Sequence, residues 1–449
     1  MIRYFSFLAI IICSVLTVSA QVTMINGISK RTRREPVKLF SVTQGQMTEV
    51  AVVTPAANGA FSFTFKPLYK GYYLVGVGSV NNGTQDKFKV YVKGDDQINL
   101  ELTNAGYMLV GRNNKENQVL EQWYKTAWKL ERKTVYFDRG PRSFAGFFPI
   151  LEETVEKARN WSNLHQTGNV EFDALMKHTV DYDLGYYALT LLLYPTASKP
   201  REEDYSPYVT NFDADQFLQD EVLLRFPYGL KMLGHLVAFK NKGLDNDFGS
   251  RVMSIPNDRL KGDYALAYAA TAKSYARFAE IAAQYGKYFV REDQQSTLAA
   301  IESKINIYKT GAAAINFTYP DVKGKQVSLA DFKGKVVLVD IWATWCGPCV
   351  KEIPSLKQLE QEFHGQDVVF VSISVDDPKD KKVWEKFIVD KQLGGVQLFA
   401  GAKAQIKRDY KISGIPRFML FDKQGKIIDV DSPRPSDPEL KEILVKYLQ

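Results

Sequence analysis

The feature that most limits the fold is one short run, VVLVDIWATWCGPCVKEIP at residues 336–354. Its first part is a nearly continuous β-branched apolar segment, which is typical of a strand buried on both faces of a sheet. The part that follows repeats apolar residues at helical spacing, namely Val350, Ile353, Leu356, Leu359 and Phe363. Cys346 and Cys349 therefore lie at the junction between a predicted strand and a predicted helix.

These two residues are the only cysteines beyond residue 20, and they are three positions apart. A disulfide between them closes a very small loop, so it would stabilise the fold only weakly. A zinc site needs about four ligands, and the four histidines are scattered without ligand spacing: His165, His178, His235 and His364. We therefore predict no metal site and interpret the pair as a redox couple.

The start of a helix suits a reactive thiol. Unpaired amides and the helix dipole favour an anion there, which lowers the pKa of a cysteine from about 8.5 toward 7 or below. Pro348 suits the first helical turn, where its missing N–H costs nothing. Because Cys349 follows one turn later, we expect it to be more buried. We therefore assign Cys346 as the exposed nucleophile and Cys349 as the resolving thiol.

The same run, with three further segments, resembles a known family. VDIWATWCGPC followed by EIP is similar to thioredoxin-fold proteins, above all to the exported TlpA/ResA-like thiol-disulfide oxidoreductases. FTYPDVKGKQVSLADFKGK resembles their amino-terminal hairpin, VVFVSISVDD a core strand, and ISGIPRFMLFDKQGKII the segment that carries their cis-proline. The resemblance covers roughly the last third of the chain. It implies an α/β thioredoxin-like domain whose own dithiol carries the electrons, without any cofactor.

Asp340 matches the buried acid of thioredoxins, beneath the cysteines. A carboxyl in an apolar strand would have a raised pKa, which suits it to take a proton from Cys349 during resolution. Many TlpA-like relatives have an uncharged residue at this position, so Asp340 favours the mechanism of thioredoxin itself. The alternative is a core acid that only hydrogen-bonds.

The resemblance also implies which residues contact a client peptide. Pro416, after Ile415, matches the cis-proline opposite the disulfide, where a cis bond leaves the preceding backbone free to pair with an extended peptide. Trp345 would flank the reactive sulfur and cover it with its ring. Gly347 and Pro348, between the cysteines, complete the predicted substrate-binding set. A plain turn proline remains the alternative for Pro416.

The dipeptide between the cysteines bears on the direction of the reaction. Gly–Pro resembles the reducing thioredoxin, whose potential is roughly −270 mV, whereas oxidants of the DsbA type carry a histidine there. We therefore expect a reductase whose partners are proteins that contain disulfides. A disulfide oxidase or isomerase is the alternative.

Residues 1–20 have the layout of a cleaved export signal. Arg3 precedes the apolar run FLAIIICSVLTV, and the small residues of VSA precede Gln21. We expect cleavage after Ala20 and a location in the periplasm or cell envelope of a bacterium. A reductase in that compartment would need electrons from a membrane donor protein, a partner that we infer from location alone.

The residues in front of the redox segment predict two other regions. Residues 21–105 read as strands and turns, with hairpins at Asn58-Gly59 and Asn82-Gly83, and predict an all-β sandwich-like domain. Helical patterns dominate residues 106–310, and the thioredoxin-like domain follows at 311–449. The predicted fold is therefore multidomain: all-β, then α-helical, then α/β.

Nothing in residues 21–310 has a catalytic pattern. The net charge of +7 is small for 449 residues, and basic runs are absent, which argues against nucleic acid as a partner. A second hypothesis follows: the chain is chiefly an envelope binding or scaffold protein with an appended redox domain. The sequence indicates neither the client nor the oligomeric state.

Overall fold

The structure is a computed structural model that describes residues 22–136, 144–193, 200–243 and 247–449. It divides into two compact units, Met1–Leu260 and Lys261–Gln449. The predicted export signal at residues 1–20 lies outside the described residues. The domain boundaries expected from the sequence stay predictions.

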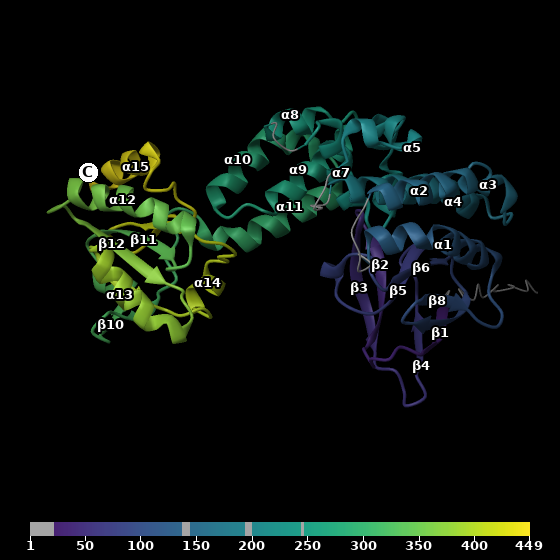
Figure 1. Cartoon of the computed structure of the whole chain (residues 1–449), viewed down its shortest axis with the longest axis horizontal. Coiled ribbons are helices and arrows are strands. Elements are labelled where there is room, and N and C mark those ends of the chain that lie inside the picture. Colours follow the sequence, from purple (N-terminus) through teal and green to yellow (C-terminus); the bar gives the residue numbers. More distant parts are fainter. Residues whose placement is uncertain (1–21, 137–143, 194–199, 244–246) are drawn as a thin grey trace, which may run out of the picture. The chain divides into compact units, whose positions relative to one another are not determined.

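The N-terminal unit begins with eight strands in two sheets (Figure 1). The strands are β1 Thr23–Ser29, β2 Val37–Thr43, β3 Gln46–Val53, β4 Ala60–Phe65, β5 Gly71–Gly76, β6 Lys87–Val92, β7 Gln97–Thr103 and β8 Gly106–Leu109. One sheet has the order β4-β1-β7-β8 and the other β3-β2-β5-β6. β1 lies parallel to β7 and antiparallel to β4.

Both sheets contribute to one hydrophobic cluster. Ile25 and Leu100 come from the first sheet, Leu39 and Val90 come from the second, and all four side chains are fully buried. Alternating apolar residues place these side chains on the inner faces. The β-rich N-terminal region predicted from the sequence is confirmed.

One of the two predicted hairpins is wrong. Asn58-Gly59 joins β3 to β4, and these strands belong to different sheets, so the turn carries the chain across the core instead of folding a strand back on its neighbour. Asn82-Gly83 lies between β5 and β6, which do pair antiparallel. A short 3-10 helix, Val80–Asn82, precedes this glycine.

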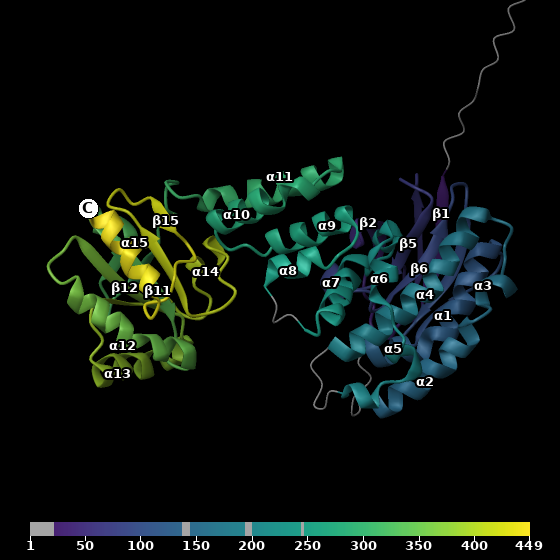
Figure 2. The same ribbon diagram turned by 90° about the horizontal axis from the view of Figure 1, so that it is seen from above.

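Helices follow the strands, as predicted for the middle region. They are α1 Lys115–Thr134, α2 Phe144–Ala158, α3 Trp161–Leu164, α4 Val170–Leu193, α5 Pro207–Thr210, α6 Ala214–Leu218, α7 Gly229–Lys240 and α8 Phe248–Met253. α1 and α4 lie side by side against the β3-β2-β5-β6 sheet (Figures 1 and 2). Asn117 of α1 exchanges two hydrogen bonds of 2.9 Å with the backbone of Tyr91, which fixes α1 along the edge strand β6.

The helical region continues with α9 Asp258–Ala269, α10 Tyr275–Tyr285 and α11 Glu292–Ile305. The remaining strands of the C-terminal unit are β9 Thr318–Pro320, β10 Gln326–Ser328, β11 Val336–Trp342, β12 Val368–Ser374, β13 Val396–Phe399, β14 Arg417–Phe421 and β15 Ile427–Asp429. Its remaining helices are α12 Gly347–Glu362, α13 Lys381–Lys391, α14 Gln405–Asp409 and α15 Pro438–Leu448. β9 and β10 form the small hairpin that was expected before the first core strand.

The five-stranded sheet of this unit has the order β13-β12-β11-β14-β15. β12 is parallel to both β11 and β13, whereas β14 is antiparallel to β11. Leu338 of β11, Leu356 of α12 and Leu440 of α15 belong to one buried cluster, which seats these helices on the sheet. The central position of β11 explains why its sequence is apolar throughout, apart from Asp340.

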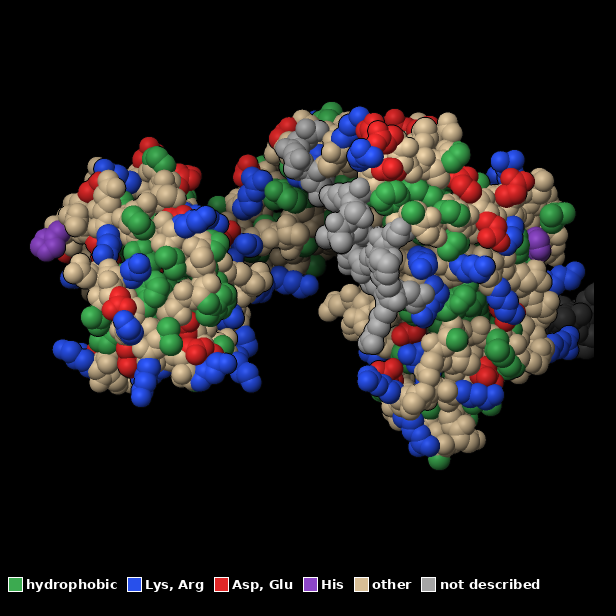
Figure 3. Space-filling model, in the orientation of Figure 1, with side chains coloured by type: hydrophobic (Ala, Val, Ile, Leu, Met, Phe, Trp, Pro, Cys, Tyr) green, Lys and Arg blue, Asp and Glu red, His purple; other side chains and the backbone are tan. Residues whose placement is uncertain are grey.

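The surface carries charges of both signs. On the face shown in Figure 3, basic and acidic side chains occur on both units. Among the described helices, none has the length and apolar content needed to cross a membrane.

Candidate active site

β11 leads into the loop that precedes the two cysteines. All seven of its residues are buried, and the loop after it ends at Cys346, which is the N-cap of α12. The carbonyl of Cys346 accepts a hydrogen bond from the amide of Val350 at 3.0 Å. The free amides in the first turn of this 16-residue helix therefore lie beside Cys346. The sequence predicted this position at a junction between a strand and a helix.

Cys346 and Cys349 are joined in a disulfide, with Cα atoms 5.2 Å apart. The amide nitrogen of Cys349 donates to Sγ of Cys346 at 3.2 Å. Cys346 is 4% exposed and Cys349 is 5% exposed. The expected contrast between an exposed nucleophile and a buried partner is therefore wrong for this oxidised form, because the bond ties the two sulfur atoms together.

Asp340 lies in the middle of β11, paired with Ser372 of β12 and Phe418 of β14. It is 9% exposed, and within the described residues its Oδ1 has no hydrogen-bond partner. Burial raises the pKa of Asp340 to about 8, and the negative charge of Glu352 adds to the effect. The carboxyl is thus poised to exchange a proton near neutral pH.

Asp340 and Cys349 line the same small cavity of about 10 Å³. A single water molecule needs about 10–15 Å³ of such space. Ser372, Glu360 and Gln397 also line the cavity, so its wall is partly polar. The acid and the second cysteine therefore face a common, narrow space of the size that one relaying water would occupy.

Glu352 is a second buried acid, three residues after Cys349 on α12. Its carboxylate accepts hydrogen bonds from the amide and the hydroxyl of Ser436, at 3.0 and 3.1 Å. The guanidinium of Arg434 lies 3.9 Å away. Sequence reasoning missed this residue, because its partners come from a segment more than 80 positions later.

The loop before Cys346 is held by Asp376, which follows β12 and is fully buried. Its carboxylate accepts hydrogen bonds from the amide of Thr344, at 3.1–3.2 Å, and from the hydroxyl of Thr344 at 2.7 Å. The hydroxyl of Ser374 donates to the same carboxylate at 2.7 Å. Asp376 therefore fixes the residue two positions before Cys346. Sequence reasoning missed this contact, for which the only local signal is the acidic end of a predicted strand.

Pro416 lies at the same edge of the sheet as the cysteines. β14 begins at Arg417, which pairs with Ile341, so Pro416 stands beside the end of β11 from which the loop to Cys346 leaves. The peptide bond between Ile415 and Pro416 is cis. Both residues are half-buried.

Three other residues named from the sequence are exposed around the disulfide. Trp345 is 68% exposed, and Gly347 and Pro348 are also exposed. The ring of Trp345 is therefore largely open to solvent. It is available to a molecule that docks at this edge.

The comparisons with known proteins agree with this geometry. Residues 309–444 match the Redoxin family. A stretch covering 32% of the chain is 31% identical to the thiol-disulfide oxidoreductase ResA of Bacillus cereus, and it spans 82% of that protein. A ResA from Bacillus thuringiensis is 32% identical, with 80% of its length spanned. The chain belongs to the ResA family of thiol-disulfide oxidoreductases.

Membership of the ResA family confirms that the C-terminal unit contains a thioredoxin-like domain and that the protein is a thiol-disulfide oxidoreductase. One solved structure similar to this chain is the thioredoxin domain of a thiol-disulfide oxidoreductase from Bacteroides vulgatus. It is 32% identical and covers 31% of this chain and 98% of its own, with a TM-score of 0.29. The ResA match leaves the N-terminal unit unexplained.

Proposed function

We propose that the protein is an exported, thioredoxin-like reductase of protein disulfides that works through Cys346 and Cys349. One observation carries the proposal: the buried Asp340 and the second cysteine line a single cavity, directly behind a cysteine that caps a helix. That arrangement supplies a nucleophile, a resolving thiol and a proton acceptor in one place. It needs no organic cofactor or metal, because the dithiol itself holds two electrons.

The first step is attack by the Cys346 thiolate on one sulfur of a client disulfide. A bond forms between Cys346 Sγ and that sulfur, and the client disulfide breaks to release one client thiolate, which takes up a proton. The amide of Cys349, 3.2 Å from Cys346 Sγ, and the α12 dipole stabilise the attacking anion.

Cys349 then resolves the mixed disulfide. Its thiol loses a proton to Asp340, and the resulting thiolate attacks Cys346 Sγ and expels the second client sulfur as a thiolate, which takes up a proton. The client has gained two electrons, and the protein is left with the disulfide seen in the structure. A carboxyl with a pKa of about 8 is close to the pKa of a free thiol, about 8.5, so the proton transfer is nearly balanced.

We expect a client to bind along the edge where Pro416 and the cysteines meet. The backbone of Ile415 pairs with an extended client segment in the manner of an added strand. The exposed Trp345, Gly347 and Pro348 would contact the client from the other side. Asp376 acts through Thr344 as a positioning residue.

Location completes the proposal. The predicted signal at residues 1–20 would place the mature protein outside the cytoplasm, beginning at Gln21, where a membrane donor protein returns it to the dithiol form. Sequencing the amino terminus of the protein from cell envelopes tests this point. A mature chain that starts at Met1 would contradict it.

The experiment that tests the reaction is a trapping assay with the two single-cysteine variants. Cys349→Ser retains the nucleophile but cannot resolve, so it should accumulate a mixed disulfide with a reporter protein such as oxidised insulin. Cys346→Ser retains only the resolving thiol and is the matched control, which should trap little. Equal trapping by both variants, or trapping by Cys346→Ser alone, would overturn the assigned roles.

A further inference from the structure

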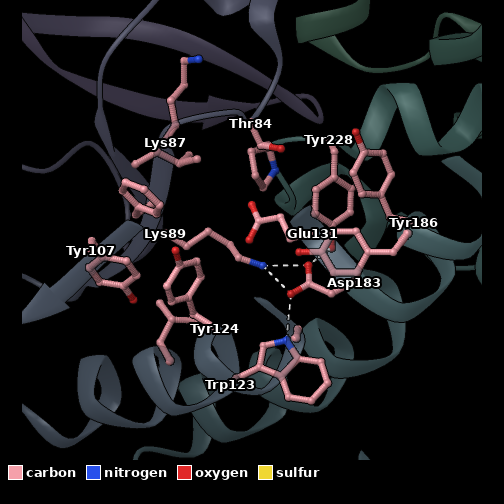
Figure 4. A pocket seen from close by; sticks show the side chains of 16 residues that line it. Thr84, Lys87, Lys89, Tyr107, Trp123, Tyr124, Glu131, Asp183, Tyr186 and Tyr228 are labelled. Carbon is pink, nitrogen blue, oxygen red and sulfur yellow. Dashed lines mark hydrogen bonds and ion pairs between the residues drawn. The ribbon is translucent and has the colours of Figure 1, made fainter. Parts of the chain in front are cut away.

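The N-terminal unit contains a partly open cavity of about 40 Å³ between its second sheet and the helices α1 and α4 (Figure 4). Aromatic rings form much of its wall, including Trp123 and Tyr124 of α1 and Tyr186 of α4. Three charged side chains enter it from different elements: Lys89 of β6, Glu131 of α1 and Asp183 of α4. We call this cavity the acid chamber.

Asp183 is fully supplied with donors. Nζ of Lys89 lies 2.7 Å from both carboxylate oxygens, and Nε1 of Trp123 donates at 2.9 Å. The hydroxyl of Tyr228 donates to the same carboxylate. Lys89 and Asp183 therefore form a paired, neutral unit in the wall of the acid chamber.

Glu131 is different. It is 8% exposed, and within the described residues its carboxyl has no hydrogen-bond or ion-pair partner. Figure 4 shows the group pointing into the middle of the acid chamber. A buried polar group without a partner costs free energy, so its retention calls for a ligand or a role.

A second lysine of the lining, Lys87, does not pair with Glu131. Nζ of Lys87 donates to the backbone carbonyls of Gly83 and Gln85, at 2.9 and 3.0 Å. In Figure 4 its side chain points away from Glu131. The ionisable group of the acid chamber that lacks a partner is therefore a carboxyl.

The walls favour a cation as well. The ring faces of tyrosine and tryptophan attract positive charge. Lys89 already makes two such cation–π contacts, because its Nζ lies 5.7 Å from the ring centre of Tyr228 and 5.9 Å from that of Tyr72. An anion in the same place would meet Glu131 and Asp183, and both lysines of the lining are already bonded, Lys89 to Asp183 and Lys87 to backbone carbonyls.

The volume of the acid chamber also limits which ligands can bind in it. At about 40 Å³ the acid chamber has room for about three water molecules, since each needs about 10–15 Å³ of such space. It borders a more open cavity of about 730 Å³, with which it shares Thr84, Tyr186, Pro227 and Tyr228. A small head group on a slender chain therefore fits, with the larger remainder of the ligand in the open cavity.

We infer that the acid chamber binds a protonated primary amine at the end of an unbranched alkyl chain, with Glu131 as its counter-ion. A free alkylamine and the side chain of a lysine in a peptide share this chemistry. The site is separate from the redox chemistry of Cys346 and does not depend on the proposed function. It gives the N-terminal unit a binding role of its own.

Amine binding in the acid chamber should depend on pH. Burial raises the pKa of Glu131 to about 8, and the charges that face it are Lys89, Asp183, Asp86 and Arg132. Three tyrosines packed nearby have raised pKa values and stay neutral: Tyr124, Tyr136 and Tyr187. Because the amine binds the carboxylate, binding at pH 7 should release close to one proton. Affinity should fall about tenfold for each unit of pH below 8.

The test is isothermal titration calorimetry on the full-length protein. The probes are n-butylamine, Nα-acetyl-lysine methylamide, and the same lysine compound with its Nε acetylated. We expect both amines to bind and the acetylated compound not to bind. Tighter binding of the lysine compound than of butylamine would identify a peptide as the source, and equal binding would identify a free amine.

Variants make the test specific. Glu131→Gln keeps the shape of the side chain and should weaken amine binding at least ~10-fold. Glu156→Gln, an exposed change on α2, is the matched control and should leave binding within about twofold. Failure of both amines to bind the wild-type protein, or equal affinity in Glu131→Gln, would overturn the inference. So would binding of the acetylated compound as tightly as its parent.

Discussion

The redox site of the C-terminal unit and the acid chamber of the N-terminal unit each bury one carboxyl, Asp340 and Glu131, with a pKa raised to about 8. In both cases desolvation is the main cause. Their surroundings differ. Asp340 shares a cavity with a cysteine that can give it a proton, whereas Glu131 faces aromatic rings and a lysine that is already paired. We therefore propose that the same physical perturbation serves proton transfer in one unit and charge recognition in the other.

Removing the nucleophile gives the largest expected effect. Cys346→Ser should lower the rate of insulin reduction by ~10³-fold or more, because a serine hydroxyl is not ionised at neutral pH and cannot form the mixed disulfide. The measurement is insulin precipitation in the presence of dithiothreitol, with Glu156→Gln as the control. Substantial insulin reduction by Cys346→Ser would show that the redox chemistry does not take place at this site. Asp340 would then have no proton to accept there, and the proposed difference between Asp340 and Glu131 would be lost.

Asp340→Asn should slow resolution of the mixed disulfide at pH 7 by about 10- to 100-fold, the usual range for loss of a general base. The pH dependence near 8 should disappear from this step. Stopped-flow measurement of mixed-disulfide decay between pH 6 and 9 checks both points, with the exposed Asp390→Asn as control. An unchanged pH profile would leave Asp340 as a core acid without a part in the reaction.

The same variant has a stability consequence. Between about pH 4 and pH 8 the folded protein keeps a proton on Asp340 that the unfolded chain has lost, so wild-type stability falls as pH rises through that window. Asn has no such proton. We expect Asp340→Asn to stabilise the C-terminal unit by roughly 1–3 kcal/mol at pH 8, and to change little at pH 4. Thermal unfolding at the two pH values measures the difference.

Asp376→Asn should have a smaller effect on exchange, about 3- to 10-fold, because the amide keeps one acceptor for Thr344 but loses the charge that strengthens the contact. Asp377→Asn is the matched control. Its exposed side chain caps a short 3-10 helix, and asparagine caps equally well. A larger fall in rate for Asp377→Asn than for Asp376→Asn would contradict the positioning role.

Glu131→Gln tests the other half of the comparison through stability alone. As with Asp340, the folded protein holds a proton on Glu131 up to about pH 8, so wild-type stability is lost between about pH 4 and pH 8. The variant should gain roughly 1 kcal/mol at pH 8 and nothing at pH 4. A loss of stability at pH 8 would show that the carboxylate has a partner in the fold.

The C-terminal site could be predicted because its signals are local. The apolar run of β11, the helical spacing after it and the Cys-Gly-Pro-Cys spacing lie within 30 residues of one another. Glu352 was missed because its burial depends on Ser436, and Asp376 because its partner lies 32 residues before it. Local pattern carries no information on such contacts.

The acid chamber could not be predicted for the same reason. Glu131 sits in the ordinary helical stretch KLERK, and its burial arises from packing against β6 and α4. The parallel pairing of β1 with β7 joins strands about 70 residues apart, and no local sequence pattern indicates it. The hairpin predicted at Asn58-Gly59 is wrong because the same kind of turn can also connect two strands of different sheets.

The measurement that tests the central claim most directly is the equilibrium reduction potential of the Cys346–Cys349 couple, titrated against glutathione and dithiothreitol in the full-length protein. A reductase with Gly–Pro between its cysteines should give a value near that of thioredoxin, roughly −270 mV. A value between about −180 and −120 mV, the range from protein disulfide isomerase to DsbA, would contradict the account and assign the protein to disulfide formation or isomerisation.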